Sequence, residues 1–328
     1  MPSNLSLFRL VCALSCAACD TRVCADQQVR TQALPQRLSQ TGLFADMREE
    51  RLAAGVFAYA PEFTLWSDGA DKRRFIAIPE GSRIDSHDAE TWTFPEGTKL
   101  WKEFHAGDLH LETRLLQKTG PGAADWAAAA YVWRTDQSDA ELAPYGALDV
   151  FATSHDVPTS GECFGCHDGG PSRILGFSAV QLAPRSYDAP TRLSDAASQA
   201  LLSEAMPTLD IPGTPTDRAA LGYLHANCSH CHNQSEAARS GSKCFNPNEK
   251  LSFDLDFTLH AQHLGSVDDT ATYRTALGKV IEPGDPGASK VVKLMEGRAG
   301  GLAQMPPLGT EHVDERGLGQ MRDWIDSL

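Results

Sequence analysis

The sequence lacks two features that would place it in large classes of proteins. No apolar run in the mature chain is long enough to cross a bilayer, so we expect no transmembrane helix. There is also no excess of basic residues, because 29 Lys and Arg face 43 Asp and Glu, which gives a formal net charge of -14. Such an acidic surface repels phosphate backbones, which argues against nucleic acid as a partner. A basic or mixed-charge protein partner is favoured instead, because opposite fields speed encounter.

The composition is that of a globular protein of more than one domain. The chain has 328 residues, of which 41% are hydrophobic and 22% charged. These fractions allow a sizeable core and argue against disorder. The length is more than one small domain needs, and it predicts two or three domains.

The N-terminus has the character of an export signal. One basic residue, Arg9, precedes a short apolar run over residues 10–18, which fits a signal-peptide core and is too short for a membrane helix. We expect residues 1–25 to be the signal, with cleavage after Ala25, and the mature chain to be periplasmic or otherwise exported. The alternative is a lipoprotein signal, with a lipid anchor on Cys16 or Cys19.

Four of the nine cysteines form two Cys-x-x-Cys-His motifs, Cys163-Phe164-Gly165-Cys166-His167 and Cys228-Ser229-His230-Cys231-His232. Two thiols on one helical turn can add to the two vinyl groups of a haem, and the following histidine can then bind the iron. The motifs therefore predict two covalently bound haem c groups, attached at Cys163, Cys166, Cys228 and Cys231, with His167 and His232 as proximal iron ligands.

Other readings of the cysteines are weaker. A four-cysteine zinc site would place its two pairs roughly 15–20 residues apart, and the gap here is much longer. A dithiol redox pair needs a βαβ context and no histidine after both copies. Cys244 belongs neither to the motifs nor to the N-terminal segment, and we expect its thiol to be buried or to form a disulfide.

The distal iron ligands are harder to read. Met305, in the segment Gln304-Met305-Pro306-Pro307, is the predicted ligand of the second haem, while Met295 and Met321 lie in amphipathic segments where methionine usually fills a core. For the first haem, Met206 is the leading candidate and His155 the main alternative. The remaining alternatives are another residue, such as Cys244 through its thiolate, or no protein ligand at all. His/Met ligation raises the reduction potential relative to bis-histidine ligation.

Three helices are predicted around the second motif, over residues 216–226, 286–295 and 313–328. Asp285 is the expected N-cap of the middle helix, with Pro286 at its first position. The first and last helices should cross closely, and Gly222 against Trp324 would allow this.

The N-terminal third predicts β-structure. Partial two-residue alternation occurs in short segments separated by turns such as Pro79-Glu80-Gly81, and it predicts an antiparallel β-sandwich or barrel. The predicted strands lie at residues 73–78, 91–94, 99–104, 110–116 and 127–133. Polar residues of this region could bind a metal or act as acid and base, but no pair has a recognisable ligand spacing, so we expect structural roles. These residues are His87, Glu103, His105, His110 and Glu112.

These segments together resemble a bacterial family of dihaem c-type cytochromes with a β-rich N-terminal domain and a largely unassigned function. The resemblance covers roughly residues 40–328. It rests on residues 65–70, 92–98 and 112–116, on Asn227 with the second motif, and on Met305-Pro306-Pro307. It implies a parallel β-helix protein as a further partner.

The expected architecture is α+β and multidomain: a β-rich domain over residues 40–152, followed by two mainly α-helical cytochrome c-type domains at 153–212 and 213–328. The expected function is electron transfer between a periplasmic donor and acceptor protein, with no catalytic residues. One alternative is a dihaem peroxidase or oxidase with an open position at the first haem. Another is a partner-binding module with redox haems.

Overall fold

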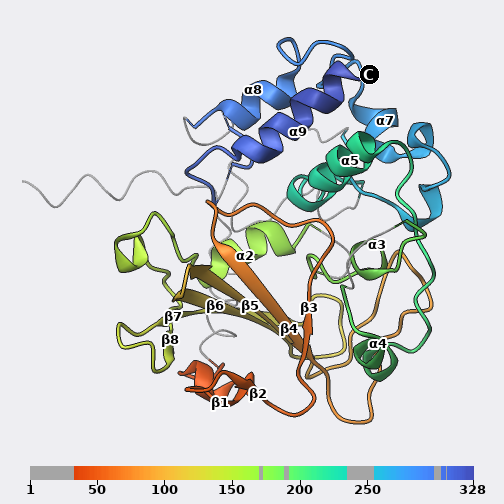
Figure 1. Ribbon diagram of the computed structural model, residues 1–328. Coiled ribbons are helices and arrows are strands. Elements are labelled where there is room, and N and C mark those ends of the chain that lie inside the picture. Colours follow the sequence, from red (N-terminus) through yellow and green to blue (C-terminus); the bar gives the residue numbers. More distant parts are fainter. Residues whose placement is uncertain (1–32, 170–172, 188–191, 235–254, 299–303, 308) are drawn as a thin grey trace, which may run out of the picture.

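The computed structural model describes residues 33–169, 173–187, 192–234, 255–298, 304–307 and 309–328. Its centre is one six-stranded antiparallel sheet in which every strand pairs with its neighbour in the sequence (Figure 1). A separate two-stranded sheet, β1 and β2, precedes it. The strands are β1 (Phe44–Asp46), β2 (Arg51–Leu52), β3 (Phe57–Tyr59), β4 (Asp71–Ala77), β5 (Lys99–Ala106), β6 (Leu109–Lys118), β7 (Trp126–Trp133) and β8 (Ala140–Leu142).

The helices follow the sheet in the chain. Short 3-10 helices also occur at η1 (Leu38–Gln40), η2 (Val150–Ala152), η3 (Ala261–His263) and η4 (Val267–Asp269). The α-helices are α2 (Ser160–His167), α3 (Ala179–Leu182), α4 (Asp195–Leu201), α5 (Pro215–Asn227), α7 (Ala271–Ala276), α8 (Lys290–Glu296) and α9 (Glu315–Asp326). No helix in the described part of the chain combines the length and the apolar character that a membrane crossing requires.

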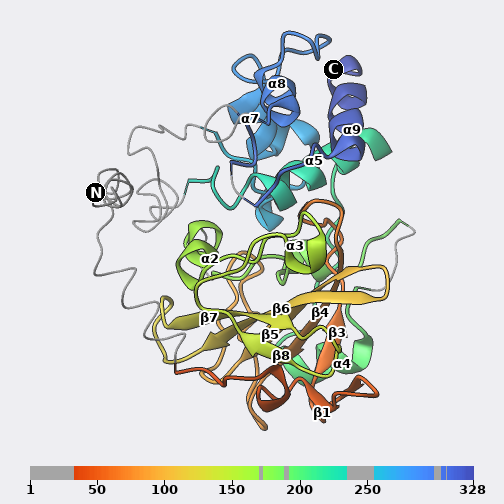
Figure 2. The same cartoon turned by 90° about the vertical axis from the view of Figure 1, so that its left-hand side faces the viewer.

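The molecule has three layers, with the sheet on one side, α2 and α3 in the middle, and α5, α7, α8 and α9 on the other side (Figures 1 and 2). Side chains alternate along each strand, so each face of the sheet is covered by a different part of the chain. On one face, Ile76, Leu100 and Leu116 pack with Phe164 of α2 and Leu201 of α4. The opposite face packs against residues that precede β3, among them Leu38 and Phe44.

The predicted fold class is wrong. The β-region is neither a sandwich nor a barrel, because its main sheet is a single open one whose edges are β3 and β8. Residues 153–212 are not a mainly helical domain either, since their helices are short and share a hydrophobic core with the sheet. The physical reason is that an open sheet leaves a large apolar face, and the segment that carries the first motif covers it.

Four predicted strands are confirmed and one is wrong. Residues 73–78, 99–104, 110–116 and 127–133 lie largely in β4, β5, β6 and β7, whereas residues 91–94 form only an isolated bridge between Asp85 and Thr93. Most of the predicted helices are also found, as α5, α8 and α9.

Two details of the helix predictions are wrong. Helix α8 begins at Lys290 after Ser289, and the Asp285 carboxylate instead accepts a hydrogen bond from the Ala288 backbone NH at 2.8 Å. Gly222 does not face Trp324, because its Cα lies against the ring of Phe63, where any side chain would collide. The close crossing of α5 and α9 uses Gly317 of α9 against Tyr223 of α5.

Candidate functional site: two haem-attachment motifs in contact

The first motif lies on α2, directly above the sheet. The helix begins with a capping box in which Thr159 and Glu162 each accept a hydrogen bond from the backbone NH of the other. Cys163 and Cys166 are three positions apart in this helix, so both thiols lie near one face. Burial raises the pKa of the Cys163 thiol to about 12, so it is protonated at neutral pH.

His167, the last residue of α2, is oriented as a proximal iron ligand would be. Its Nδ1 lies 2.7 Å from the backbone oxygen of Arg173. A carbonyl oxygen only accepts, so Nδ1 carries the proton and Nε2 keeps its lone pair. Burial lowers the pKa of His167 to about 4, with smaller contributions from Lys102 and Arg114, so the ring is neutral. A neutral imidazole held by a backbone carbonyl is the usual form of a metal-binding histidine.

The second motif continues from the end of α5. The Cys228 NH bonds to Leu224 O at 2.9 Å and the His232 NH to Cys228 O at 2.8 Å, so the motif forms one further turn. Cys228 packs against the hydrophobic cluster of the C-terminal helices. The His232 ring contacts the ring of Phe257 edge-on at 5.6 Å between centroids, and burial lowers its pKa to about 4.

The two motifs touch each other, although 60 residues separate His167 from Cys228 in the chain. The side-chain amide of Asn233 donates to the backbone oxygen of Gly169 at 2.9 Å. Gly169 also lies against the carbonyl group of His230, where any side chain would collide. Groups attached to the two motifs would therefore be close neighbours.

A row of cations crosses the sheet beside the first motif. Arg74 on β4, Lys102 on β5 and Arg114 on β6 are direct cross-strand partners. Like charges in such positions destabilise a sheet. Arg114 is balanced by Glu112, but within the described ranges no acidic side chain forms an ion pair with Arg74 or Lys102. Burial and the neighbouring cations hold the pKa of Lys102 well below its ordinary value.

This cation row fits an anionic group bound at the first motif. Arg114 and Lys102 lie near enough to oppose the rise in the pKa of the Cys166 thiol that burial causes. Haem carries two propionate groups, and buried cations without a carboxylate partner are what such groups require. The thiols, the neutral histidines and the cation row are the groups that haem c requires; Cys163, Cys166 and His167 would hold one such group, and Cys228, Cys231 and His232 the other.

The proposed distal ligands are all among the described residues, but no described contact joins any of them to a motif histidine. Met206 is partly buried and packs against the same hydrophobic cluster as Cys163. Met305 follows α8, and its backbone NH donates to Leu294 O at 2.8 Å. His155, the alternative for the first haem, is buried and lies 2.8 Å from the Glu112 carboxylate through its Nε2. Both methionine assignments remain predictions.

The loop between β3 and β4 joins the sheet to the second motif and to the C-terminal region. The Trp66 NH donates to the side-chain oxygen of Asn227 at 2.7 Å, immediately before Cys228. The Asp68 carboxylate accepts from the backbone NH groups of Glu311 and His312. The other sequence-based predictions on residues 1–25, Cys16, Cys19 and Cys244 lie outside the described residues.

A second group of polar residues was not predicted as a site. The structure brings together Glu103, His105 and His110, on the sheet face opposite the cation row. His87 is exposed elsewhere, and Glu112 faces α2, where it pairs with Arg114 and His155. A signal for the cluster was present in the sequence, since a two-residue turn at Gly107-Asp108 places His110 opposite His105.

The comparisons with known proteins add no identification. No protein-family model matches the chain, and neither the curated proteins nor the solved structures yield a significant match.

Proposed function

We propose that this protein is an exported dihaem c-type cytochrome that carries electrons between a donor and an acceptor protein. The observation that carries the proposal is the direct contact between two haem-attachment motifs, at Gly169, His230 and Asn233. When bound, the two haem irons supply one-electron redox chemistry. The contact makes them neighbours, so an electron entering at one site has a short path to the other.

The residues around each motif have separate tasks in this proposal. The four motif cysteines bind the groups covalently, which keeps them attached in a compartment from which free haem would diffuse away. Arg173 orients His167 through its backbone oxygen. Lys102 and Arg74 would hold the propionates of the first haem. Met206 would be the distal ligand of the first haem, and Met305 that of the second.

The chain's acidic character decides the kind of partner in this proposal. A net charge of -14 favours encounter with proteins that present basic or mixed-charge surfaces, and association should weaken as salt is added. The export signal at residues 1–25 would place donor and acceptor in the periplasm.

Optical and magnetic spectra of the matured protein test the proposal. An electron carrier should have two six-coordinate, low-spin haems in both oxidation states, and its reduced form should not bind carbon monoxide. A high-spin signal in the oxidised protein, together with rapid carbon monoxide binding, would contradict the carrier role and favour an enzyme with an open iron position.

Ligand variants sharpen this test. Met305→Ala should convert only the second haem to high spin, and Met206→Ala only the first. Met295→Leu is the matched control, because Met295 is a buried core residue next to the second motif's cluster, and its spectrum should not change. An unchanged spectrum in Met305→Ala, or a changed one in Met295→Leu, would refute the Met305 assignment.

A further inference from the structure

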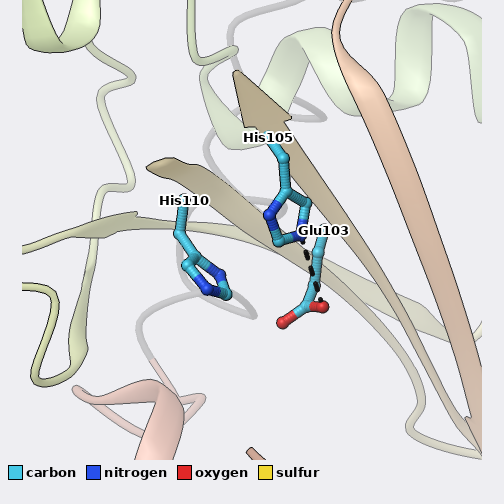
Figure 3. A group of neighbouring side chains, drawn as sticks. All are labelled: Glu103, His105 and His110. Atoms are coloured by element: carbon cyan, nitrogen blue, oxygen red, sulfur yellow. Dashed lines mark ion pairs between the residues drawn. The ribbon is translucent and has the colours of Figure 1, made fainter. Parts of the chain in front are cut away.

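A buried cluster of three metal-binding residue types lies on the sheet face opposite the cation row. Glu103 and His105 are two positions apart on β5, so they point to the same face, and His110 is on β6. Figure 3 shows the three side chains extending from the two strands to one side of the sheet. Each offers one ligand atom, and these atoms all lie within 4.8 Å of one another. We call Glu103, His105 and His110 the β5–β6 cluster.

The turn between β5 and β6 creates the β5–β6 cluster. Because only Gly107 and Asp108 separate the paired residues Ala106 and Leu109, His105 and His110 lie directly opposite each other, with ring centroids 4.4 Å apart. A β-bulge follows immediately: Phe104 pairs with Glu112, so Leu111 has no partner on β5. Bulges often redirect a side chain at a functional position.

The cluster contains buried polar atoms that make no hydrogen bond. They are Glu103 Oε1, His105 Nε2 and His110 Nδ1, on residues that are 0%, 9% and 8% exposed. His105 Nε2 lies 3.6 Å from Glu103 Oε2, which is too long for a hydrogen bond. Each unsatisfied buried group costs about 1–3 kcal/mol, so three in one place call for an explanation.

The residues around the cluster orient it for a cation. His110 Nε2 lies 2.9 Å from Glu50 Oε1; since the carboxylate accepts, Nε2 carries the proton and Nδ1 is left with its lone pair. Arg73 donates through its Nε to Glu103 Oε2 at 2.8 Å, which leaves Oε1 for another partner. Two carboxylates and one guanidinium leave a net negative charge at the site. Carboxylates that hydrogen-bond a ligand histidine in this way are typical of metal sites.

We propose that Glu103, His105 and His110 bind a divalent transition-metal ion of the zinc type, separate from the haem groups. Two imidazoles and a carboxylate suit zinc and its first-row neighbours rather than calcium or magnesium. Zinc–ligand bonds near 2.0–2.1 Å require ligand atoms about 3.3 Å apart, so the distances between the ligand atoms shorten by up to about 1.5 Å on binding. His105 is also one of the residues that line a cavity of about 150 Å³, together with Asp68 and Asp71.

The test uses the full-length, haem-loaded protein, in which the motif cysteines are already occupied. After treatment with EDTA, the protein is titrated with zinc chloride by calorimetry, and bound zinc is measured by mass spectrometry after gel filtration. We expect one zinc ion per chain. His105→Asn, His110→Asn and Glu103→Gln should each bind at least tenfold more weakly, on the order of the loss for a missing ligand or its hydrogen-bonding partner.

The matched control is His87→Asn, which makes the same change at an exposed histidine and should bind zinc as the wild type does. Far-ultraviolet circular dichroism checks that each variant is folded. X-ray absorption at the zinc edge supplies a second measurement that needs no variant, and it should show nitrogen and oxygen neighbours with two imidazoles. Absence of stoichiometric binding, wild-type binding in His105→Asn, or sulfur neighbours at the zinc would overturn the proposal.

Discussion

The two Cys-x-x-Cys-His motifs have the same spacing but lie in different surroundings. The first is on α2 above the sheet, where Lys102, Arg114 and Arg173 all act on the electrostatics of His167. The second follows α5 and lies against an apolar cluster, and burial lowers the pKa of His232. Charge and burial are separate means of tuning a bound redox group. If both motifs carry haem, as we propose, the two haems should have different potentials, because nearby cations act on the first and an apolar cluster surrounds the second.

The largest expected effect concerns the carboxylate that balances the charge beside the first motif. Glu112 is fully buried and pairs with Arg114 and His155, and these partners hold its pKa below the usual value although burial acts to raise it. Glu112→Gln should lower the free energy of unfolding by about 3–5 kcal/mol, because it leaves Arg114 unbalanced next to Lys102. Urea denaturation measures this loss.

The matched control for that variant is Glu141→Gln. Glu141 pairs with Arg134, but its side chain is 61% exposed, so the loss should be no more than about 1 kcal/mol. Equal losses in the two variants would show that the charge balance under α2 contributes no more than an exposed ion pair does.

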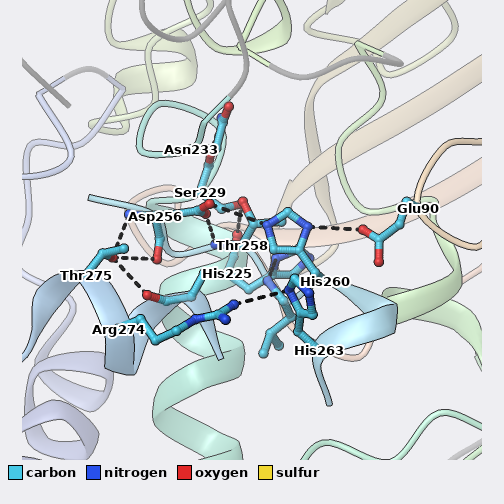
Figure 4. Close-up of polar contacts among 12 residues, drawn as sticks. Glu90, His225, Ser229, Asn233, Asp256, Thr258, His260, His263, Arg274 and Thr275 are labelled. Atoms are coloured by element: carbon cyan, nitrogen blue, oxygen red, sulfur yellow. Dashed lines mark hydrogen bonds and ion pairs between the residues drawn. The ribbon is translucent and has the colours of Figure 1, made fainter. Parts of the chain in front are cut away.

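The second prediction concerns the pH dependence of stability, through His260 near the second motif. His260 lies between Asp256 and Glu90, and thereby links the C-terminal region to the segment before β5 (Figure 4). Hydrogen bonds to the two carboxylates raise the pKa of His260 to about 9. A raised folded-state pKa contributes stability fully below the unfolded value of about 6.5, and that contribution is lost as the pH rises through about 9.

We therefore expect the contribution of His260, on the order of 2 kcal/mol, to disappear between about pH 6.5 and 9. Lys72, whose pKa burial lowers to about 8, titrates in the opposite sense, so the measured quantity is the difference between wild type and His260→Gln. That difference in unfolding free energy should shrink as pH rises, while His87→Gln should show no such trend. A difference that is constant with pH would contradict the assignment.

The smallest expected effect is a change in stability when one cation is removed from the row of Arg74, Lys102 and Arg114. In a chain that cannot attach the first haem, because Cys163 and Cys166 are both alanine, Lys102→Met should raise the unfolding free energy by about 1 kcal/mol. The change removes a buried cation between two others and keeps a side chain of similar size. In the haem-loaded protein the same change should bring no gain in stability and should lower the potential of the first haem only.

Thermal or urea unfolding with and without the first haem, together with a redox titration, measures these effects. An equal gain in stability in both forms would show that Lys102 does not interact with the bound group. A shift in the potential of the second haem instead of the first would contradict the placement of the row.

Local patterns predicted much of the fold, and the failures come from contacts between distant residues. Alternation identified β5, β6 and β7, and the apolar period identified α5 and α9, because both signals lie within a few neighbouring residues. The sequence did not reveal that residues 153–212 cover the sheet. The apolar residues of a segment predict that it is buried, but not which surface it packs against. Gly222 was matched to Trp324 instead of Phe63 for the same reason.

The candidate site divides in the same way. The motif cysteines and histidines were read directly from their spacing, whereas the contact between Gly169 and His230 joins segments far apart in the chain. The row of Arg74, Lys102 and Arg114 depends on the register of three strands, which short alternating segments do not specify. The β5–β6 cluster depends on the two-residue turn at Gly107-Asp108, which was visible in the sequence, but the register that follows the turn was not.

The central claim is that both motifs carry covalent haem, and the most direct measurement is the haem content of the purified, matured protein by pyridine haemochrome assay and intact mass. We expect two haem c groups per chain, one in the Cys163→Ala/Cys166→Ala variant, one in Cys228→Ala/Cys231→Ala, and two in the Cys244→Ser control. A colourless protein, a single haem in the wild type, or zinc bound at the motif cysteines would contradict the account.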